Sequence, residues 1–215
     1  AFKIEVTRIS YGYQTFEIEA DSREAAEAAA IEAAHNEVFS ETSAEYDIVV
    51  YVDGDNDGTE KWLIENGIRY LKNETDSPMG IAYGYNRCIE AATTPIVCMF
   101  HADMYMGKGF DTAILKYLKP LSVVSGTRIE PQLHPARLEK IVENFGMYPE
   151  DFTETEFDNF VEKMQSVHQN KTTNGIFAPW AIYKEDITSI GMHDERFHSY
   201  HEDSDIFNRF ILICK

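Results

Sequence analysis

Residues 47–59 read Asp47-Ile48-Val49-Val50-Tyr51-Val52-Asp53-Gly54-Asp55-Asn56-Asp57-Gly58-Thr59. The unbroken apolar run from Ile48 is typical of a strand that is buried on both faces. The Asp, Asn and Gly residues that follow it favour a turn, and Thr59 suits the start of a helix. A buried strand, a turn and a helix in this order indicate an α/β domain.

The same alternation continues toward the C-terminus. Apolar periodicity and turn residues predict helices at 59–66, 80–92 and 110–118, strands at 68–71, 96–100, 122–125 and 177–183, and a last helix that opens at 200–205. Strands that alternate with helices predict a mostly parallel, Rossmann-like sheet with helices on both faces. Prolines interrupt residues 127–170, which we expect to form a helical insertion over the edge of the sheet.

The first 46 residues differ in pattern from the rest. Residues 2–9 alternate apolar and polar side chains, Gly12 suits a turn, and the alternation resumes at residues 16–20, which predicts a β-hairpin. Asp21 or Ser22 then caps an alanine-rich helix. This ββα unit resembles the small DpnD/PcfM-like domain. We therefore expect two units, residues 1–46 and residues 47–215.

The net charge of the chain limits the classes of partner that it can bind. A formal net charge of -18 repels nucleic acid and anionic lipid, so we expect neither as a partner. A phosphate ligand would need a cation, a positive side chain or backbone N–H groups. No apolar run is long enough for a membrane span, and no signal peptide is visible at the start. We therefore expect a cytoplasmic protein.

Acidic side chains follow two of the predicted strands and open the last helix. Asp53 and Asp55 follow the first buried strand, and His101 and Asp103 follow the strand at 96–100. Glu202 and Asp203 open the last helix, with Arg209 about two turns later. Ligands of open α/β sheets bind at the carboxyl ends of the strands, so these clusters fall where a site is expected.

Each cluster also has a purely structural interpretation. The acids after Val52 suit a turn, Asp103 suits a cap after its strand, and acids at a helix start are stabilised by the helix dipole. A calcium loop of the EF-hand type is excluded after Val52, because a strand precedes it and its twelfth position is Ile64 instead of Glu.

The functional interpretation gives each cluster a different task. Asp53 would accept hydrogen bonds from a nucleobase or ribose. Asp103 would hold Mg²⁺ or Mn²⁺ against a diphosphate. Asp203 would act as general base on a hydroxyl, and Arg209 would pair with the acids or reach a phosphate.

The order of these motifs resembles glycosyltransferase family 2. Its members typically run apolar strand, Asp-Gly-Ser-x-Asp-Gly-Thr, a helix with an Asn-x-Gly motif, a strand with Asp-x-Asp, Gly-Gly-Phe-Asp-Glu-x-Phe, and Glu-Asp with a later Arg. This chain has the corresponding stretches 52–59, 79–92, 101–104, 190–197 and 202–209. The resemblance implies a GT-A fold.

The resemblance also implies an activity and a site. The chain would be an inverting, metal-dependent hexosyltransferase that moves a sugar from a nucleoside diphosphate sugar to an acceptor hydroxyl. The roles that it implies are catalysis by Asp203 and Glu202, nucleotide binding by Asp53, Asp55, Asn86, Arg87 and Arg209, and metal binding by Asp103 and His101. His193 or His198 would be a further ligand of Mn²⁺ or Mg²⁺, and residues 127–170 would face the acceptor.

Two departures keep alternatives open. Family members usually begin with a further strand and helix that form the middle of the sheet, and here the ββα unit stands in that place. Either the hairpin supplies the strand or the nucleotide pocket lacks a wall. His101 also replaces the first acid of Asp-x-Asp. The alternatives are a catalytically incomplete nucleotide-sugar-binding or protein-interaction module, and a nucleotidyltransferase-like enzyme, against which the Glu202-Asp203 pair argues.

Overall fold

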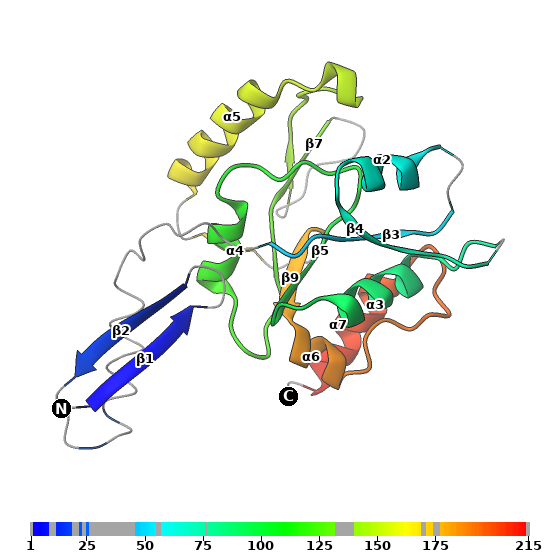
Figure 1. Cartoon of the computed structure of the whole chain (residues 1–215). Helices are drawn as coiled ribbons and strands as arrows, with labels where there is room; N and C mark the ends of the chain where they lie inside the picture. Colours follow the sequence, from blue (N-terminus) through cyan, green and yellow to red (C-terminus); the bar gives the residue numbers. More distant parts are fainter. Residues whose placement is uncertain are drawn as a thin grey trace.

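The structure is a computed structural model that describes residues 2–8, 12–18, 22, 25, 46–54, 57–75, 77–131, 140–168, 171–173 and 177–213. Its elements are β1 (Phe2–Arg8), β2 (Gly12–Ile18), β3 (Val49–Val52), α2 (Thr59–Glu65), β4 (Arg69–Lys72), α3 (Ile81–Ala91), β5 (Ile96–Met99), α4 (Phe110–Tyr117), β6 (Val124–Ser125), β7 (Arg128–Glu130), β8 (Lys140–Val142), the 3-10 helix η1 (Pro149–Asp151), α5 (Glu154–Val167), β9 (Trp180–Tyr183), α6 (Lys184–Ser189) and α7 (Glu202–Ile213) (Figure 1). The helices and strands predicted between residues 48 and 118 are all present.

The described strands do not form the mostly parallel sheet that the sequence predicts. β3 and β4 form a parallel pair, whereas β9 lies between β5 and β6 and runs antiparallel to both. The apolar composition of β9 shows that it is buried but carries no information on its direction. The segment between β6 and β9 contains β7, β8, η1 and α5, so its length allows β9 to pair in either direction.

Helices do cover both faces of the β5–β9–β6 sheet, as the sequence predicts. Trp180 and Ile182 of β9 point to one face, where they pack with α3 and α7 through Ile89, Ile206 and Phe210. Ala181 points to the other face and packs with Ile114 and Leu118 at α4. This alternation follows from the two-residue period of a strand.

Among the described residues of the range 127–170, helix is confined to η1 and α5. The range begins with β7 and β8, a parallel pair in which Arg128 lies opposite Lys140. The β-branched residues of these segments favour strands, and Pro149 restricts the backbone to the short η1 turn before α5 begins.

The predicted N-terminal hairpin is present. β1 and β2 are antiparallel, with Arg8 opposite Gly12, and among the described strands they pair only with each other. They therefore add no strand to β3 or β5. Ser22 Oγ accepts the N–H of Ala25 at 3.1 Å, as expected at the start of the next helix, most of which lies outside the described residues.

Candidate functional site

Asp53 fastens the start of α3 to the end of β3. Its Oδ1 accepts the N–H of Met79 at 2.7 Å and a hydrogen bond from Asn73 Nδ2 at 3.1 Å, and its Oδ2 accepts the N–H of Gly80 at 2.8 Å. The strand-end carboxylate thus takes up N–H groups that the first turn of a helix leaves without partners. Asp55, predicted to contact the nucleotide, lies outside the described residues.

His101 and Asp103 lie in the loop that follows β5. Asp103 is exposed, whereas His101 is half-buried and stacks on Tyr85 of α3 with 6.1 Å between ring centroids. The N–H of Met104 donates to the carbonyl of His101 at 3.2 Å, which closes a turn around Asp103. The turn presents the Asp103 carboxylate to solvent at the end of the strand.

Asn86 holds the segment between α6 and α7 against α3. Its side chain accepts the N–H of His193 at 2.9 Å and donates to the carbonyl of His193 at 2.9 Å and to Glu195 Oε1 at 3.0 Å. Asn86 is itself buried. Its amide is therefore occupied in fixing the backbone at His193.

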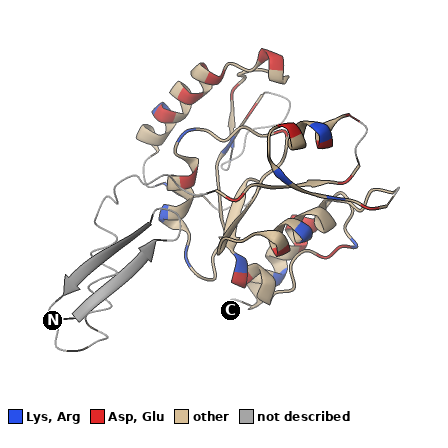
Figure 2. Cartoon of the chain, viewed as in Figure 1, with Lys and Arg blue, Asp and Glu red and all other residues tan. Residues whose placement is uncertain are grey.

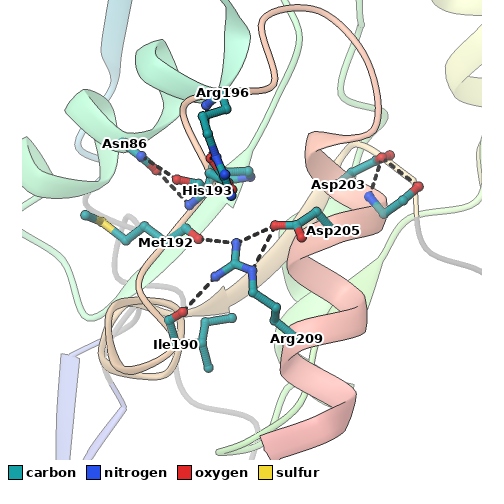
Figure 3. Close-up of polar contacts among 10 residues, drawn as sticks. Asn86, Ile190, Met192, His193, Arg196, Asp203, Asp205 and Arg209 are labelled. Carbon is teal, nitrogen blue, oxygen red and sulfur yellow. Dashed lines mark hydrogen bonds and ion pairs between the residues drawn. The ribbon is translucent and has the colours of Figure 1, made fainter.

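Arg209 holds the same segment from the side of α7 (Figure 3). Its guanidinium donates to the carbonyls of Ile190 at 2.7 Å and Met192 at 2.6 Å, and its Nε donates to Asp205 Oδ2 at 2.8 Å. The donors of Arg209 are thus directed at the protein's own backbone and at Asp205.

Replacing Arg209 with Met should therefore destabilise the fold. Two carbonyls and the Asp205 carboxylate would lose a half-buried partner, which is expected to cost ~2–3 kcal/mol of unfolding free energy in chemical denaturation. The matched control is Arg196→Met, because the Arg196 side chain is exposed and, within the described part of the chain, forms an ion pair with Asp194 alone. An unchanged stability with lost nucleotide affinity would instead assign Arg209 to phosphate binding.

Arg87 lies on the exposed side of α3. It forms ion pairs with Glu90 at 3.0 Å and Glu195 at 3.1 Å, and its guanidinium lies 4.8 Å from the centroid of the Tyr83 ring. The ring of Tyr83 in turn packs edge-on against Tyr51 at 5.8 Å. Arg87 is only partly buried, so these contacts leave part of its guanidinium open to solvent.

Glu202 and Asp203 open α7 but have different surroundings. Glu202 is 8% exposed, whereas Asp203 is half-buried and accepts from its neighbour Ser204, from the N–H at 2.6 Å and from Oγ at 3.2 Å. His201 precedes them with a positive φ of 71°, so the chain turns sharply into the helix. His198 is exposed, and its carbonyl accepts the N–H of Ile81 at 3.0 Å.

Tyr85 and His193 are the residues that the sequence interpretation undervalued. Their rings lie 5.3 Å apart between α3 and α7, and His193 also contacts Trp180 at 5.9 Å. Tyr85 Oη and both ring nitrogens of His193 are buried without a hydrogen-bond partner among the described residues. No sequence signal marked Tyr85, since an aromatic ring at helical spacing looks like core, and the sequence predicted His193 only as an alternative metal ligand to His198.

The charges of three carboxylates act on Tyr85. Burial raises the pKa of Tyr85 well above its ordinary value, and the charges of Glu202, Asp203 and Asp103 raise it further. The loop after β5 contacts Tyr85 directly, because His101 of that loop stacks on the Tyr85 ring. Burial likewise lowers the pKa of His193 to about 4, aided by Arg209 and opposed by Asp203 and Asp205.

The charge balance of this region favours a cation. Asp103, Glu202, Asp203 and Asp205 are acidic, while Arg209 is held by Asp205 and two carbonyls. Among the described residues no three His, Cys, Asp or Glu side chains converge as a complete metal site. An Mg²⁺-like ion does not need such a cage, because one or two carboxylates and substrate phosphates suffice.

Comparison with known proteins identifies a family. The sequence model of a protein family described as glycosyl transferase family 2 matches residues 25–187. A search of curated proteins finds no match. None of the helices in the described part of the chain combines the length and the apolar character that crossing a membrane requires.

Proposed function

The chain belongs to glycosyl transferase family 2, and from this premise we propose that it transfers a sugar from a nucleoside diphosphate sugar to an acceptor hydroxyl with inversion. The observation that supports this proposal most directly is the family match over residues 25–187, and the structure places the exposed Asp103 after β5 and Asp203 on the first turn of α7. Acids from the end of β5 and the start of α7 suit a site that holds a diphosphate on one side and a hydroxyl on the other.

Asp203 is the proposed general base. It lies on the first turn of α7 and is more open to solvent than Glu202, so an acceptor can reach it. Asp203 would take the proton of the acceptor hydroxyl as its oxygen forms a bond to the anomeric carbon. The bond from that carbon to the diphosphate breaks on the opposite face, which inverts the configuration. Glu202 would support the base from its buried position beside it.

His101 and Asp103 are the proposed residues for Mn²⁺ or Mg²⁺. A carboxylate and an imidazole at the end of β5 fit such an ion, and the surplus of negative charge around Tyr85 favours a cation there. When bound, the ion would neutralise the charge of the departing diphosphate.

The nucleoside would lie along the start and exposed side of α3. Asp53 and Arg87 border this region, and the rings of Tyr51 and Tyr83 lie beside them. Asn86 and Arg209 would act on the nucleotide site through the segment that they hold, residues 190–195. Asp55 would complete the turn after β3.

A catalytically incomplete module is the second candidate, and one observation favours it. Among the described strands β3 pairs only with β4, and β5 pairs only with β9, so no strand joins the two sheets. Such a chain would hold a nucleotide weakly or not at all. Calorimetry with UDP and with GDP, each with and without Mn²⁺, separates the two candidates. Binding in at least one condition supports the enzyme, and its absence in all four refutes it.

Replacing Asp103 with Asn tests the metal site. We expect the variant to lose most of the gain in UDP or GDP affinity that Mn²⁺ provides, on the order of tenfold or more, because a carboxylate ligand is replaced by a weaker amide. Glu185→Gln is the matched control, since it removes one exposed carboxylate on α6. An equal Mn²⁺ effect in both variants would show that Asp103 does not bind the ion.

A further inference from the structure

The loop that follows Asp103 is hydrogen-bonded to α5 near both ends of that helix. Tyr105 Oη donates to Glu154 Oε1 at 2.8 Å near the start of the helix, and Gln165 Nε2 donates to the carbonyl of Lys108 at 3.0 Å near its end. Between these two contacts, a Cβ on Gly107 would lie 3.1 Å from both Phe157 and Val161. The backbone thus approaches α5 as closely as a glycine permits.

Two large apolar side chains nevertheless remain exposed on this loop. Tyr105 is 42% exposed and Met106 is 41% exposed. The Tyr105 ring packs on Phe152 at 4.9 Å and against Phe157 at 5.5 Å, so its orientation is set by the rings beneath it. Adjacent apolar side chains that are exposed and held in place suggest a contact surface.

The position of this surface relates it to the proposed reaction. Tyr105 and Met106 follow Asp103 by two and three residues in the same loop. If Asp103 lies beside the departing diphosphate, the acceptor arrives within reach of this loop. The surface is therefore placed to contact the acceptor, whose identity the proposed reaction leaves open.

We propose that Tyr105 and Met106 form a stacking surface for an uncharged carbohydrate acceptor, an inference that rests on the proposed sugar transfer. A tyrosine ring offers an apolar face to the C–H groups of a sugar, and neighbouring carboxylates accept hydrogen bonds from its hydroxyls. Glu154 is such a neighbour, because its Oε1 accepts the hydrogen bond from Tyr105 Oη.

The surrounding charge argues against other occupants. The elements η1 and α5 are mostly acidic (Figure 2): they carry Glu150, Asp151, Glu154, Glu156, Asp158 and Glu162 against the single base Lys163, and Lys108 adds one base in the loop. They would repel a phosphorylated acceptor, an anionic glycan or an anionic membrane. Two exposed side chains also offer far less area than the roughly 800 Å² per partner of a stable protein interface.

Titration of the full chain with uncharged β-linked tetrasaccharides of glucose and of N-acetylglucosamine, followed by saturation-transfer NMR, tests the proposal. At least one should bind, and Tyr105→Ala should weaken it about tenfold, as expected for loss of a central aromatic contact. Met106→Ala should weaken it less. Trp62→Ala, which removes an exposed aromatic ring from α2, is the matched control and should leave binding unchanged. Thermal melts check that each variant is folded.

The outcomes separate this inference from the proposed function. Three results would each overturn the stacking surface. The first is that neither tetrasaccharide binds, and the second is that Tyr105→Ala and Trp62→Ala have an equal effect. The third is preferential binding of oligogalacturonate or of phosphatidylglycerol vesicles. UDP and GDP calorimetry on the Tyr105→Ala variant should match the unaltered chain. Nucleotide binding without tetrasaccharide binding refutes only this inference, whereas Tyr105-dependent tetrasaccharide binding without nucleotide binding refutes only the sugar transfer.

Discussion

Replacing Asp203 with Asn should abolish sugar transfer while leaving nucleotide binding nearly unchanged. The amide cannot accept the acceptor proton, so kcat should fall by about 10²- to 10⁴-fold, the usual contribution of a general base. Asparagine has almost the same size as aspartate and can still accept from Ser204, so the start of α7 should persist. Transfer assays and UDP or GDP calorimetry on the same preparation measure both effects.

Two further variants test whether the general base is Asp203 and not Glu202. Glu202→Gln alters a carboxylate that is 8% exposed, so its effect on transfer should be smaller than that of Asp203→Asn and should be accompanied by a lower melting temperature. Glu185→Gln makes the same chemical change as Glu202→Gln at an exposed position on α6 and should leave transfer unaltered. Transfer that survives in Asp203→Asn refutes its role as base, and a loss of nucleotide affinity above tenfold would place it in donor binding instead.

Local sequence signals predicted the elements of the fold better than their arrangement. The strand at β3 and the helices α2 and α3 begin and end where turn residues such as Gly58 and Gly80 allow a positive φ. The strand predicted at 177–183 is present as β9, in which the structure places Trp180 and Ala181 on opposite faces of the sheet. The direction of β9 could not be predicted, because an apolar strand has the same pattern in either direction.

In the candidate site, too, the sequence identified individual residues better than the contacts between them. The sequence pointed to Asp103 and Asp203 because each lies at an element boundary, where side chains face a ligand edge. It could not show that the polar atoms of Asn86 and Arg209 bind the segment at residues 190–195, since Asn and Arg suit a ligand and a backbone carbonyl equally well. Nor could it show Tyr85 between the acids, because its significance depends on three segments that meet only in the folded chain.

His193 should make the fold sensitive to acid. It is 3% exposed, and burial is the main reason that its pKa falls to about 4 from an ordinary value of 6.5. The groups that face it are Tyr85 from α3, Trp180 from β9, and Arg209, Asp203 and Asp205 from α7. Among these only the two aspartates favour the protonated imidazole, and they do not offset its burial.

The sign of the effect follows from which state binds the proton. Below pH 6.5 the unfolded chain protonates this imidazole while the folded chain does not, so stability falls as the pH falls. The loss is complete near pH 4 and amounts to about 3 kcal/mol for a pKa of about 4 against 6.5. Above pH 6.5 His193 is neutral in both states and contributes no pH dependence.

His193→Phe isolates this contribution. Phenylalanine keeps the ring contacts with Tyr85 and Trp180 and cannot titrate, so urea unfolding between pH 7 and pH 4 should show a shallower loss of stability than the unaltered chain. The comparison uses the slope of the unfolding free energy against pH, because a bulkier ring can shift that free energy by a constant amount at every pH. His168→Gln, at an exposed His after α5, should leave the slope unchanged. Equal slopes for His193→Phe and the unaltered chain would mean that His193 titrates near its ordinary pKa.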